Sequence, residues 1–250
     1  MRWLVLCLAL AAVAGCGGDD EPAAEEEPRL VVSAAASLSD ALTACSKEFE
    51  GADVKLSFAG SDELAAQIRQ GVKPDVYAAA NTRLPEELNQ EGLLGTPVEF
   101  ATNELVIAVG GEGTEVEKVE DLAKPGMQLA IGAESVPVGA YTREVLGRLP
   151  AGLEEKILAN VRSEEPDVKG VVGKLTQGAA DAGFVYVTDV TEGITGVELP
   201  PELRPTVAYG AGVVEGAKQP ELVQQFLDGL TEGPCADALR EEGFGPPPSG

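Results

Sequence analysis

Residues 30–58 read LVVSAAASLSDALTACSKEFEGADVKLSF, and this stretch decides the fold. It opens at 30–33 with a short apolar run that contains β-branched residues, which is typical of a strand. Apolar residues then recur at helical spacing as far as Phe49, and Gly51 marks the expected end of that helix. A second strand is expected at 54–58, where polar and apolar residues alternate. The stretch is therefore one strand–helix–strand unit.

The same alternation continues along the chain. A helix is expected after Ser61, a strand at 75–78 and a helix at 84–88. Three strand-to-helix units in succession predict an α/β fold with a mainly parallel sheet and helices on its faces. Further strands are expected at 104–109, 129–131, 184–186 and 206–209, and further helices at 139–146, 168–175 and 222–230. The strands at 105–109 and 207–214 are candidates for connections between two lobes.

The first 28 residues differ from the rest of the chain. Arg2 and a following apolar run, shorter than the roughly 20 residues of a membrane-spanning helix, predict a signal peptide over 1–15. Small residues precede Cys16, and this arrangement resembles the lipobox of bacterial lipoproteins, in which the cysteine is lipidated. The alternative is an ordinary cleaved signal peptide. Residues 16–28 are acidic and lack large apolar side chains, which predicts a disordered tether.

Composition excludes several classes of function. A formal net charge of -24 argues against nucleic acid as a partner and against docking on anionic lipid, because both need a basic surface. The chain has no histidine, which removes Ser-His-Asp and Cys-His catalysis and imidazole metal sites. Glycine-rich phosphate loops and nucleophile-elbow motifs are also missing from the sequence. These absences favour a binding protein over an enzyme and call for no cofactor.

Two cysteines remain in the part of the chain that is expected to fold. Cys45 lies in the first expected helix, and Cys235 lies near the C-terminal end. In an oxidising compartment an isolated pair of cysteines suggests a disulfide. Two buried free thiols are the alternative.

Two serines stand at expected helix starts. Ser37 and Ser61 each follow a strand and precede a helix, among small residues. Loops of this kind lie at the carboxyl ends of parallel strands, where α/β proteins bind ligands. A helix start offers unpaired N–H groups and partial positive charge, so two converging starts can bind an anion without lysine or arginine. The simpler interpretation is that each serine caps its helix.

Several motifs together resemble one known family. They are Ala34-Ala35-Ala36-Ser37-Leu38, Phe58-Ala59-Gly60-Ser61, Leu64-Ala65-Ala66-Gln67-Ile68, Pro74-Asp75-Val76-Tyr77, Asn103-Glu104-Leu105-Val106, Val136-Pro137-Val138-Gly139-Ala140-Tyr141 and Asp181-Ala182-Gly183-Phe184-Val185-Tyr186. In this order, from Leu30 to Gly243-Phe244, they resemble the molybdate-binding proteins of ABC transporters. The resemblance implies a two-lobe, type II periplasmic-binding-protein fold with its ligand cleft between the lobes.

The resemblance also implies a set of ligand contacts. These are the hydroxyl and backbone N–H groups of Ser37 and Ser61, the backbone N–H groups of Val138 and Val168, and the hydroxyl of Tyr186. Val161 is an alternative to Val168. Val138 stands where the family usually has alanine, and its extra methyl groups narrow the expected pocket. Protein atoms are expected to contact the oxygens of the anion, so no residue is expected to ligate the metal directly.

The expected function follows from that resemblance. We expect a monomeric, extracytoplasmic lipoprotein that binds molybdate or tungstate and delivers it to an ABC permease, touching the membrane only through its lipid anchor. The first lobe is expected to comprise residues 29–104 and 208–250, and the second lobe residues 105–207. Sulfate or an organic anion is the alternative ligand. A hydrolase with Ser37 or Ser61 as nucleophile is the alternative from another class.

Overall fold

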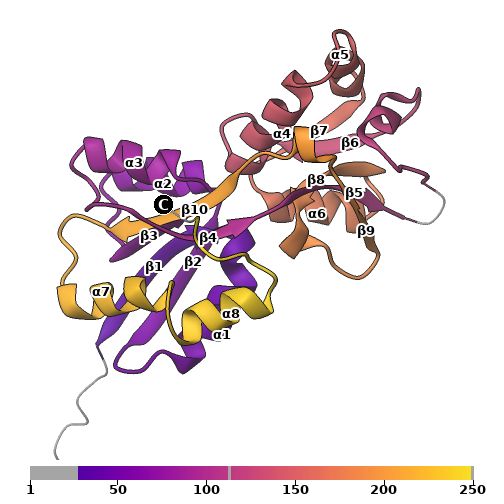
Figure 1. Cartoon of the computed structure of the whole chain (residues 1–250). Coiled ribbons are helices and arrows are strands. Elements are labelled where there is room, and N and C mark those ends of the chain that lie inside the picture. Colours follow the sequence, from indigo (N-terminus) through magenta and orange to yellow (C-terminus); the bar gives the residue numbers. More distant parts are fainter. Residues whose placement is uncertain (1–27, 112–113, 249–250) are drawn as a thin grey trace, which may run out of the picture.

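The computed structural model describes residues 28–111 and 114–248. The expected signal peptide, Cys16 and nearly all of the expected tether lie outside these residues. The described chain forms two five-stranded sheets, each flanked by helices (Figure 1). The α/β fold with two lobes is therefore confirmed, and the lobes are named here after the first and the second sheet.

The first sheet has the strand order β2-β1-β3-β10-β4. Its strands are β1 (Arg29–Ala35), β2 (Asp53–Ala59), β3 (Val76–Ala79), β4 (Val98–Asn103) and β10 (Val207–Val213). β1 pairs in parallel with β2 and β3, whereas β10 runs antiparallel to both β3 and β4. One strand of five thus opposes the direction of the others.

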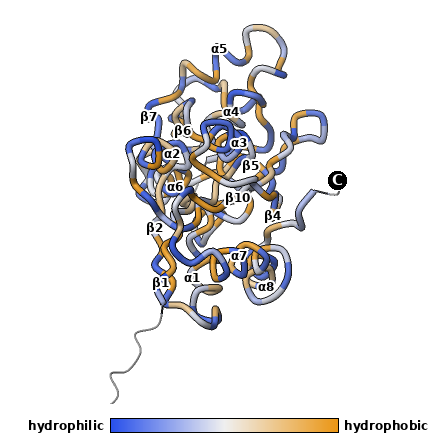
Figure 2. The backbone as a smooth tube through the Cα atoms, turned by 90° about the vertical axis from the view of Figure 1, so that its left-hand side faces the viewer, coloured by the Kyte–Doolittle hydropathy of each residue, from blue (hydrophilic) through white to orange (hydrophobic). Residues whose placement is uncertain are grey.

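Helices cover both faces of the first sheet (Figure 1). They are η1 (Ala36–Leu38), α1 (Ser39–Glu48), α2 (Ser61–Arg69), α3 (Arg83–Gln90), α7 (Pro220–Gly229) and α8 (Pro234–Glu241). Successive side chains of a strand point to opposite faces, and β3 shows the consequence. Tyr77 and Ala79 pack in a core with α2 and α3, whereas Val76 and Ala78 pack in the main core with α1, α7 and α8. Figure 2 shows hydrophobic and hydrophilic residues alternating along α7, as expected of a helix with one buried face.

The second sheet repeats this plan with the order β7-β6-β8-β5-β9. Its strands are β5 (Leu105–Gly110), β6 (Leu129–Gly132), β7 (Val161–Glu165), β8 (Ala182–Tyr186) and β9 (Ile194–Glu198). Its helices are η2 (Val119–Ala123), α4 (Pro137–Gly147), α5 (Leu153–Leu158), α6 (Val168–Thr176), η3 (Val187–Asp189) and η4 (Pro201–Leu203). β5 runs antiparallel to β8 and β9, while β6 pairs in parallel with β7 and β8.

The chain passes between the lobes twice (Figure 1). It leaves the first sheet at Asn103, the last residue of β4, and enters the second at Leu105, the first residue of β5. It returns after β9 through η4 into β10. β5 and β10 are each the first strand after a crossing, and each runs against its neighbours. The direction of a strand after a crossing depends on how the chain connects the two sheets. Hydrophobic periodicity along the chain does not predict that direction.

Three strands were not expected from the sequence, and each lies at the edge of a sheet. β4 ends the first sheet, and β7 and β9 end the second. Their sequences VEFATN, VRSEE and ITGVE expose many of their residues. An edge strand that is partly in solvent lacks the apolar run that identifies a buried strand. Helices α5 and α8 were also missed.

Cys45 and Cys235 form a disulfide between α1 and α8, with their Cα atoms 4.6 Å apart. Both side chains are buried, and the bridge joins residues 190 positions apart in the chain. It therefore fastens the C-terminal helix to the first helix of the first lobe. Within residues 28–111 and 114–248, no helix combines the length and the apolar content needed to cross a bilayer.

Candidate ligand-binding site

A small cavity lies between the two lobes. The five residues expected to contact the ligand all line it, namely Ser37, Ser61, Val138, Val168 and Tyr186. Each of them is at most 5% exposed. Val161, the alternative to Val168, lies in β7 and is not among the lining residues. The structure therefore brings together groups from the first lobe and groups from the second, up to 149 positions apart in the chain.

The size of the cavity limits what it can hold. Its volume is about 20 Å³, counted as space for the centre of a water-sized sphere. A sphere of that volume has a radius of about 1.7 Å, and adding about 1.4 Å for a water radius gives room for a ligand of roughly 3 Å radius. Organic ligands of drug size need cavities of roughly 300 Å³ or more. A compact inorganic ion fits this space, whereas a sugar does not.

Ser61 presents a free hydroxyl hydrogen to the cavity. It is the first residue of α2, and its Oγ accepts a hydrogen bond from the Ala80 N–H at 3.1 Å. Its carbonyl oxygen accepts a second bond from the buried Tyr77 hydroxyl at 2.7 Å. The oxygen of the Ser61 hydroxyl is thus already in use as an acceptor, and its hydrogen remains available to a ligand. Both bonds hold the residue in place.

Ser37 is oriented by a chain of hydrogen bonds that the sequence did not reveal. The Asn103 Nδ2 group lies 3.3 Å from the Tyr209 hydroxyl, which in turn lies 3.0 Å from Ser37 Oγ. An amide nitrogen can only donate, so the Tyr209 oxygen accepts from Asn103; either hydroxyl can donate in the Tyr209–Ser37 bond, and when an anion takes the Ser37 hydrogen, Tyr209 is the donor. In that arrangement the Ser37 hydrogen points into the cavity. Burial raises the pKa of Tyr209, which keeps this hydroxyl protonated.

Neither serine caps its helix. No side chain caps η1, α1 or α2, and both hydroxyl oxygens bond elsewhere. The simpler interpretation of these serines, helix capping, is therefore not what the structure shows.

Tyr186 carries a buried hydroxyl with no partner. It is 1% exposed, and its oxygen has no hydrogen-bond partner among the described residues. Burial raises the pKa of Tyr186 well above its ordinary value, so the group is a neutral donor at physiological pH. A buried unsatisfied hydroxyl costs about 1–3 kcal/mol. A ligand oxygen in the cavity would remove this cost.

Helix starts from the second lobe supply backbone donors. Val138 lies in the first turn of α4 after Pro137, and Val168 is the first residue of α6. The first N–H groups of a helix have no partner inside the helix. In α6 the side chain of Asp167 accepts from the Gly170 N–H at 2.8 Å. The Val168 N–H is therefore left for another acceptor.

The donors that face the cavity are neutral hydroxyl and N–H groups, and the one carboxylate among the described lining residues, that of Asp167, accepts a hydrogen bond from the Gly170 N–H. No lysine or arginine is found among the described residues that line the cavity. Four helix starts meet there, those of η1, α2, α4 and α6, and each contributes partial positive charge. These dipoles attract an anion locally, although the protein as a whole carries a formal net charge of -24. The arrangement can bind a small anion through hydroxyl and N–H donors.

The lobes are closed on each other at this cavity. Gly60 of the first lobe lies so close to the second lobe that a Cβ atom would collide with the carbonyl oxygen of Pro166. The backbone at Gly60 has a φ of -58°, which any residue adopts, so the need for glycine here is steric. Small neighbours therefore permit the close approach of the two lobes.

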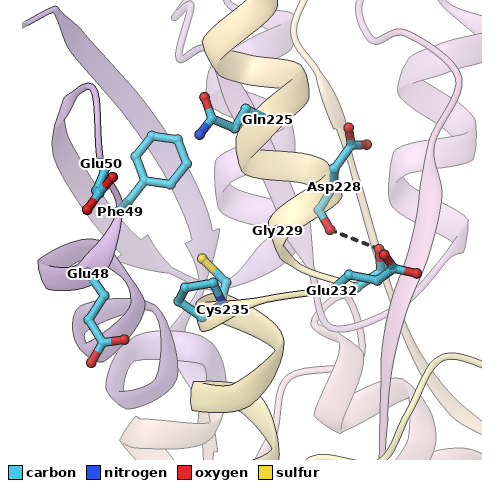
Figure 3. A pocket seen from close by; sticks show the side chains of 10 residues that line it. Glu48, Phe49, Glu50, Gln225, Asp228, Gly229, Glu232 and Cys235 are labelled. Carbon is cyan, nitrogen blue, oxygen red and sulfur yellow. Dashed lines mark hydrogen bonds between the residues drawn. The ribbon is translucent and has the colours of Figure 1, made fainter.

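A larger hollow elsewhere is not a candidate for an anion. It has a volume of about 720 Å³ and lies beside the disulfide, next to the ends of α1 and α7 (Figure 3). Its lining includes four carboxylates, from Glu48, Glu50, Asp228 and Glu232. These would repel an anion. Within the described residues, no group of three or more histidine, cysteine or acidic side chains could hold a metal ion.

Comparison with known proteins gives a consistent result. Residues 30–245 match the family model described as bacterial extracellular solute-binding protein. The molybdate-binding protein ModA of Mycobacterium tuberculosis is 34% identical, over 99% of this chain and 100% of that protein. The periplasmic molybdate-binding protein of Azotobacter vinelandii has a similar structure, with a TM-score of 0.78 at 23% identity, covering 88% of this chain and 100% of that one. The sulfate-binding protein SubI of M. tuberculosis has a TM-score of 0.75 at 14% identity, covering 88% and 87%.

Proposed function

Because this chain belongs to the family of bacterial extracellular solute-binding proteins, we propose that it binds molybdate or tungstate between its lobes and delivers the anion to an ABC importer. The family consists of solute-binding proteins, so the chain is an extracytoplasmic binding protein and not an enzyme. The ligand is proposed to be an intact oxyanion, without a cofactor. A permease in the membrane is the proposed partner, and the binding protein is proposed to be a monomer.

The proposal rests mainly on the buried hydroxyl of Tyr186. The buried Tyr186 hydroxyl lacks a partner among the described residues and lines a cavity of oxyanion size. The hydroxyl groups of Ser37 and Ser61 line the other side of the cleft, where each can donate to a bound oxygen while its own oxygen accepts from Tyr209 or Ala80. We propose that these three hydroxyl groups and the N–H groups of Val138 and Val168 replace the water shell of the anion.

Sulfate is the second candidate because the sulfate-binding SubI shares the fold. Sulfate and molybdate carry the same charge and the same tetrahedral oxygens, so donors alone distinguish them poorly. Size distinguishes them better, since molybdate is the larger ion and a rigid cavity rewards the ion that fills it. The 34% identity to a molybdate-binding protein over its full length favours molybdate.

We also propose how the rest of the chain is organised. The two sheets support a first lobe of residues 29–104 and 208–250 and a second lobe of residues 105–207. Residues 1–15 are proposed to be removed as a signal peptide. Lipidation of Cys16 would then keep the receptor near its permease, at the end of the acidic segment 16–28.

Ligand identity can be tested by thermal unfolding of the domain from Arg29 onward. Molybdate or tungstate at 100 times its Kd should add about 2.7 kcal/mol to the free energy of unfolding. For a domain of this size, that raises the Tm by roughly 5–10 °C. Sodium chloride at equal ionic strength is the control for non-specific salt effects. A shift with sulfate alone would replace the molybdate proposal with the sulfate one, and no shift with any tetrahedral oxyanion would refute both.

A second test concerns the residues behind Ser37. Tyr209→Phe should weaken anion binding by about three- to tenfold, because a net hydrogen bond is worth about 1 kcal/mol and the Ser37 hydroxyl loses its orienting donor. Titration calorimetry measures the Kd. If Tyr209 acts through Ser37, the same change should have no further effect in a Ser37→Ala background. Equal effects in both backgrounds would show that Tyr209 acts independently of Ser37.

A further inference from the structure

Lys169 lies between two carboxylates that belong to different lobes. It is the second residue of α6 in the second lobe. Its Nζ atom is 3.1 Å from Oδ1 of Asp189, in η3 of the same lobe. It is also 3.0 Å from Oδ2 of Asp40, in α1 of the first lobe. The pair of Lys169 and Asp40, called here the inter-lobe ion pair, spans the cleft.

We propose that the inter-lobe ion pair forms when the cleft closes, and that Lys169 is thereby a positioning residue that slows release of the bound anion. This inference rests on the proposed function as an anion receptor. It concerns closure of the lobes and not contact with the ligand, since Lys169 is not among the residues that line the cavity.

Asp189 is what makes Lys169 suited to this role. The Asp189 side chain is 0% exposed, and neither of its oxygens has a hydrogen-bond partner of good geometry among the described residues. Burial raises the pKa of Asp189 to about 6, against the opposing influence of Lys169, so the group is ionised at neutral pH. Its ion pair with Lys169 compensates that buried charge.

A lysine held in this way differs from an ordinary surface lysine. A surface ion pair loses much of its energy to the entropy of ordering a flexible side chain. Here Asp189 already orders the Lys169 side chain within the second lobe. The ammonium group has three donors, so it can bind Asp189 and still donate to Asp40. The bond to Asp40 is therefore formed at a smaller entropic cost.

The position of the pair links it to the binding site. Val168, which lines the cavity, directly precedes Lys169. Asp40 follows Ser37 by three residues, and η1, which contains Ser37, packs against α6. Separation of the lobes would break the bond to Asp40 and leave the Lys169–Asp189 pair intact, because the latter lies within one lobe. The inter-lobe ion pair thus stabilises the closed state over the open state.

Asp40→Asn separates this mechanism from simple electrostatics. Removing a negative charge near the cavity should by itself tighten the binding of a divalent anion. Loss of the inter-lobe ion pair should instead raise the Kd for molybdate by about two- to fivefold, with a faster release of radiolabelled molybdate. The two mechanisms therefore predict opposite signs. Asp40 is 64% exposed, so the variant should fold normally.

Asp53→Asn is the matched control. Asp53 pairs with Lys55 at 2.7 Å within β2, and both side chains are about half exposed. The substitution removes the same charge from an ion pair inside one lobe. It should leave the Kd and the release rate unchanged.

A double-mutant cycle shows whether Asp40 acts through Lys169. Lys169→Met should weaken binding by more than Asp40→Asn, because it removes the inter-lobe ion pair and also a positive charge that attracts the anion. Adding Asp40→Asn to Lys169→Met should then cause no further weakening. If Asp40→Asn in an otherwise wild-type protein leaves binding unchanged or makes it tighter, the proposed role of the inter-lobe ion pair is refuted. The proposed function would be unaffected by that result. Absence of molybdate and tungstate binding by the wild-type protein would overturn the proposed function, and this inference with it.

Discussion

Replacing Cys45 and Cys235 with alanine is expected to lower the free energy of unfolding by about 2–5 kcal/mol. The bridge spans 190 positions of the chain and joins α1 to α8. A cross-link of that length removes many conformations from the unfolded chain, and the chain-entropy treatment gives about 5 kcal/mol as its contribution. For a domain of roughly this size, the Tm should fall by about 5–15 °C. Thermal unfolding of the domain from Arg29 onward measures the change.

The effect of the bridge must be separated from the effect of the side chains. Both cysteines are buried, so their replacement by alanine also removes packing. The wild-type domain in the presence of a reductant keeps the side chains and loses the bridge, and it should show most of the decrease. The unfolded, unreduced wild-type domain should contain no free thiol. Two free thiols per chain, or equal stability with and without reductant, would contradict the bridge.

The double substitution Ser37→Ala and Ser61→Ala is expected to weaken anion binding by at least 100-fold. A hydrogen bond to a charged group is worth about 1.5–3 kcal/mol, which corresponds to roughly 10- to 150-fold for each serine. The two serines share no hydrogen-bond partner within the protein, but both are proposed to contact the same anion, so the lower limits of the two single effects set the expected loss. Titration calorimetry with molybdate measures the loss.

Ser57→Ala provides the control for this experiment. Ser57 lies on β2, two residues before Ala59, and it is exposed. Its replacement should leave the Kd unchanged. The double variant loses the buried bonds to Ala80 and Tyr209, so its Tm should fall, but it should still unfold cooperatively well above the temperature of the titration. A loss of less than about tenfold in the double variant would contradict the proposed role of the serine hydroxyls.

Much of the fold could be predicted because its signals are local. The apolar run at 30–33 and the helical spacing after it predicted β1 and α1, and the same reasoning predicted β3 with α3. Such patterns depend on neighbouring residues alone, since periods of 2 and 3.6 mark strands and helices. Edge strands such as β7 were not predicted, because a strand with exposed residues lacks an apolar pattern.

Only part of the candidate site could be predicted from local sequence patterns. Ser37 and Ser61 could be predicted from their positions at expected helix starts. Val138, Val168 and Tyr186 were predicted only from the family resemblance. Other residues gave no signal at all. Tyr209 reaches Ser37 across 172 positions, and Lys169 reaches Asp40 across 129. Contacts between such distant residues depend on how the lobes pack, and a pattern of neighbouring residues cannot encode them.

The sequence by itself therefore determined the alternation of strands and helices, the absence of histidine chemistry and the two serines at helix starts. Each of these follows from residue type or from local spacing. The tertiary structure decided which strands run antiparallel, which donors face the cavity and which charges meet across the cleft. The physical reason is that the direction in which a hydroxyl donates is set by its other hydrogen-bond partners. For Ser37 and Ser61 those partners are the Tyr209 hydroxyl and the Ala80 N–H group, which only folding places beside them.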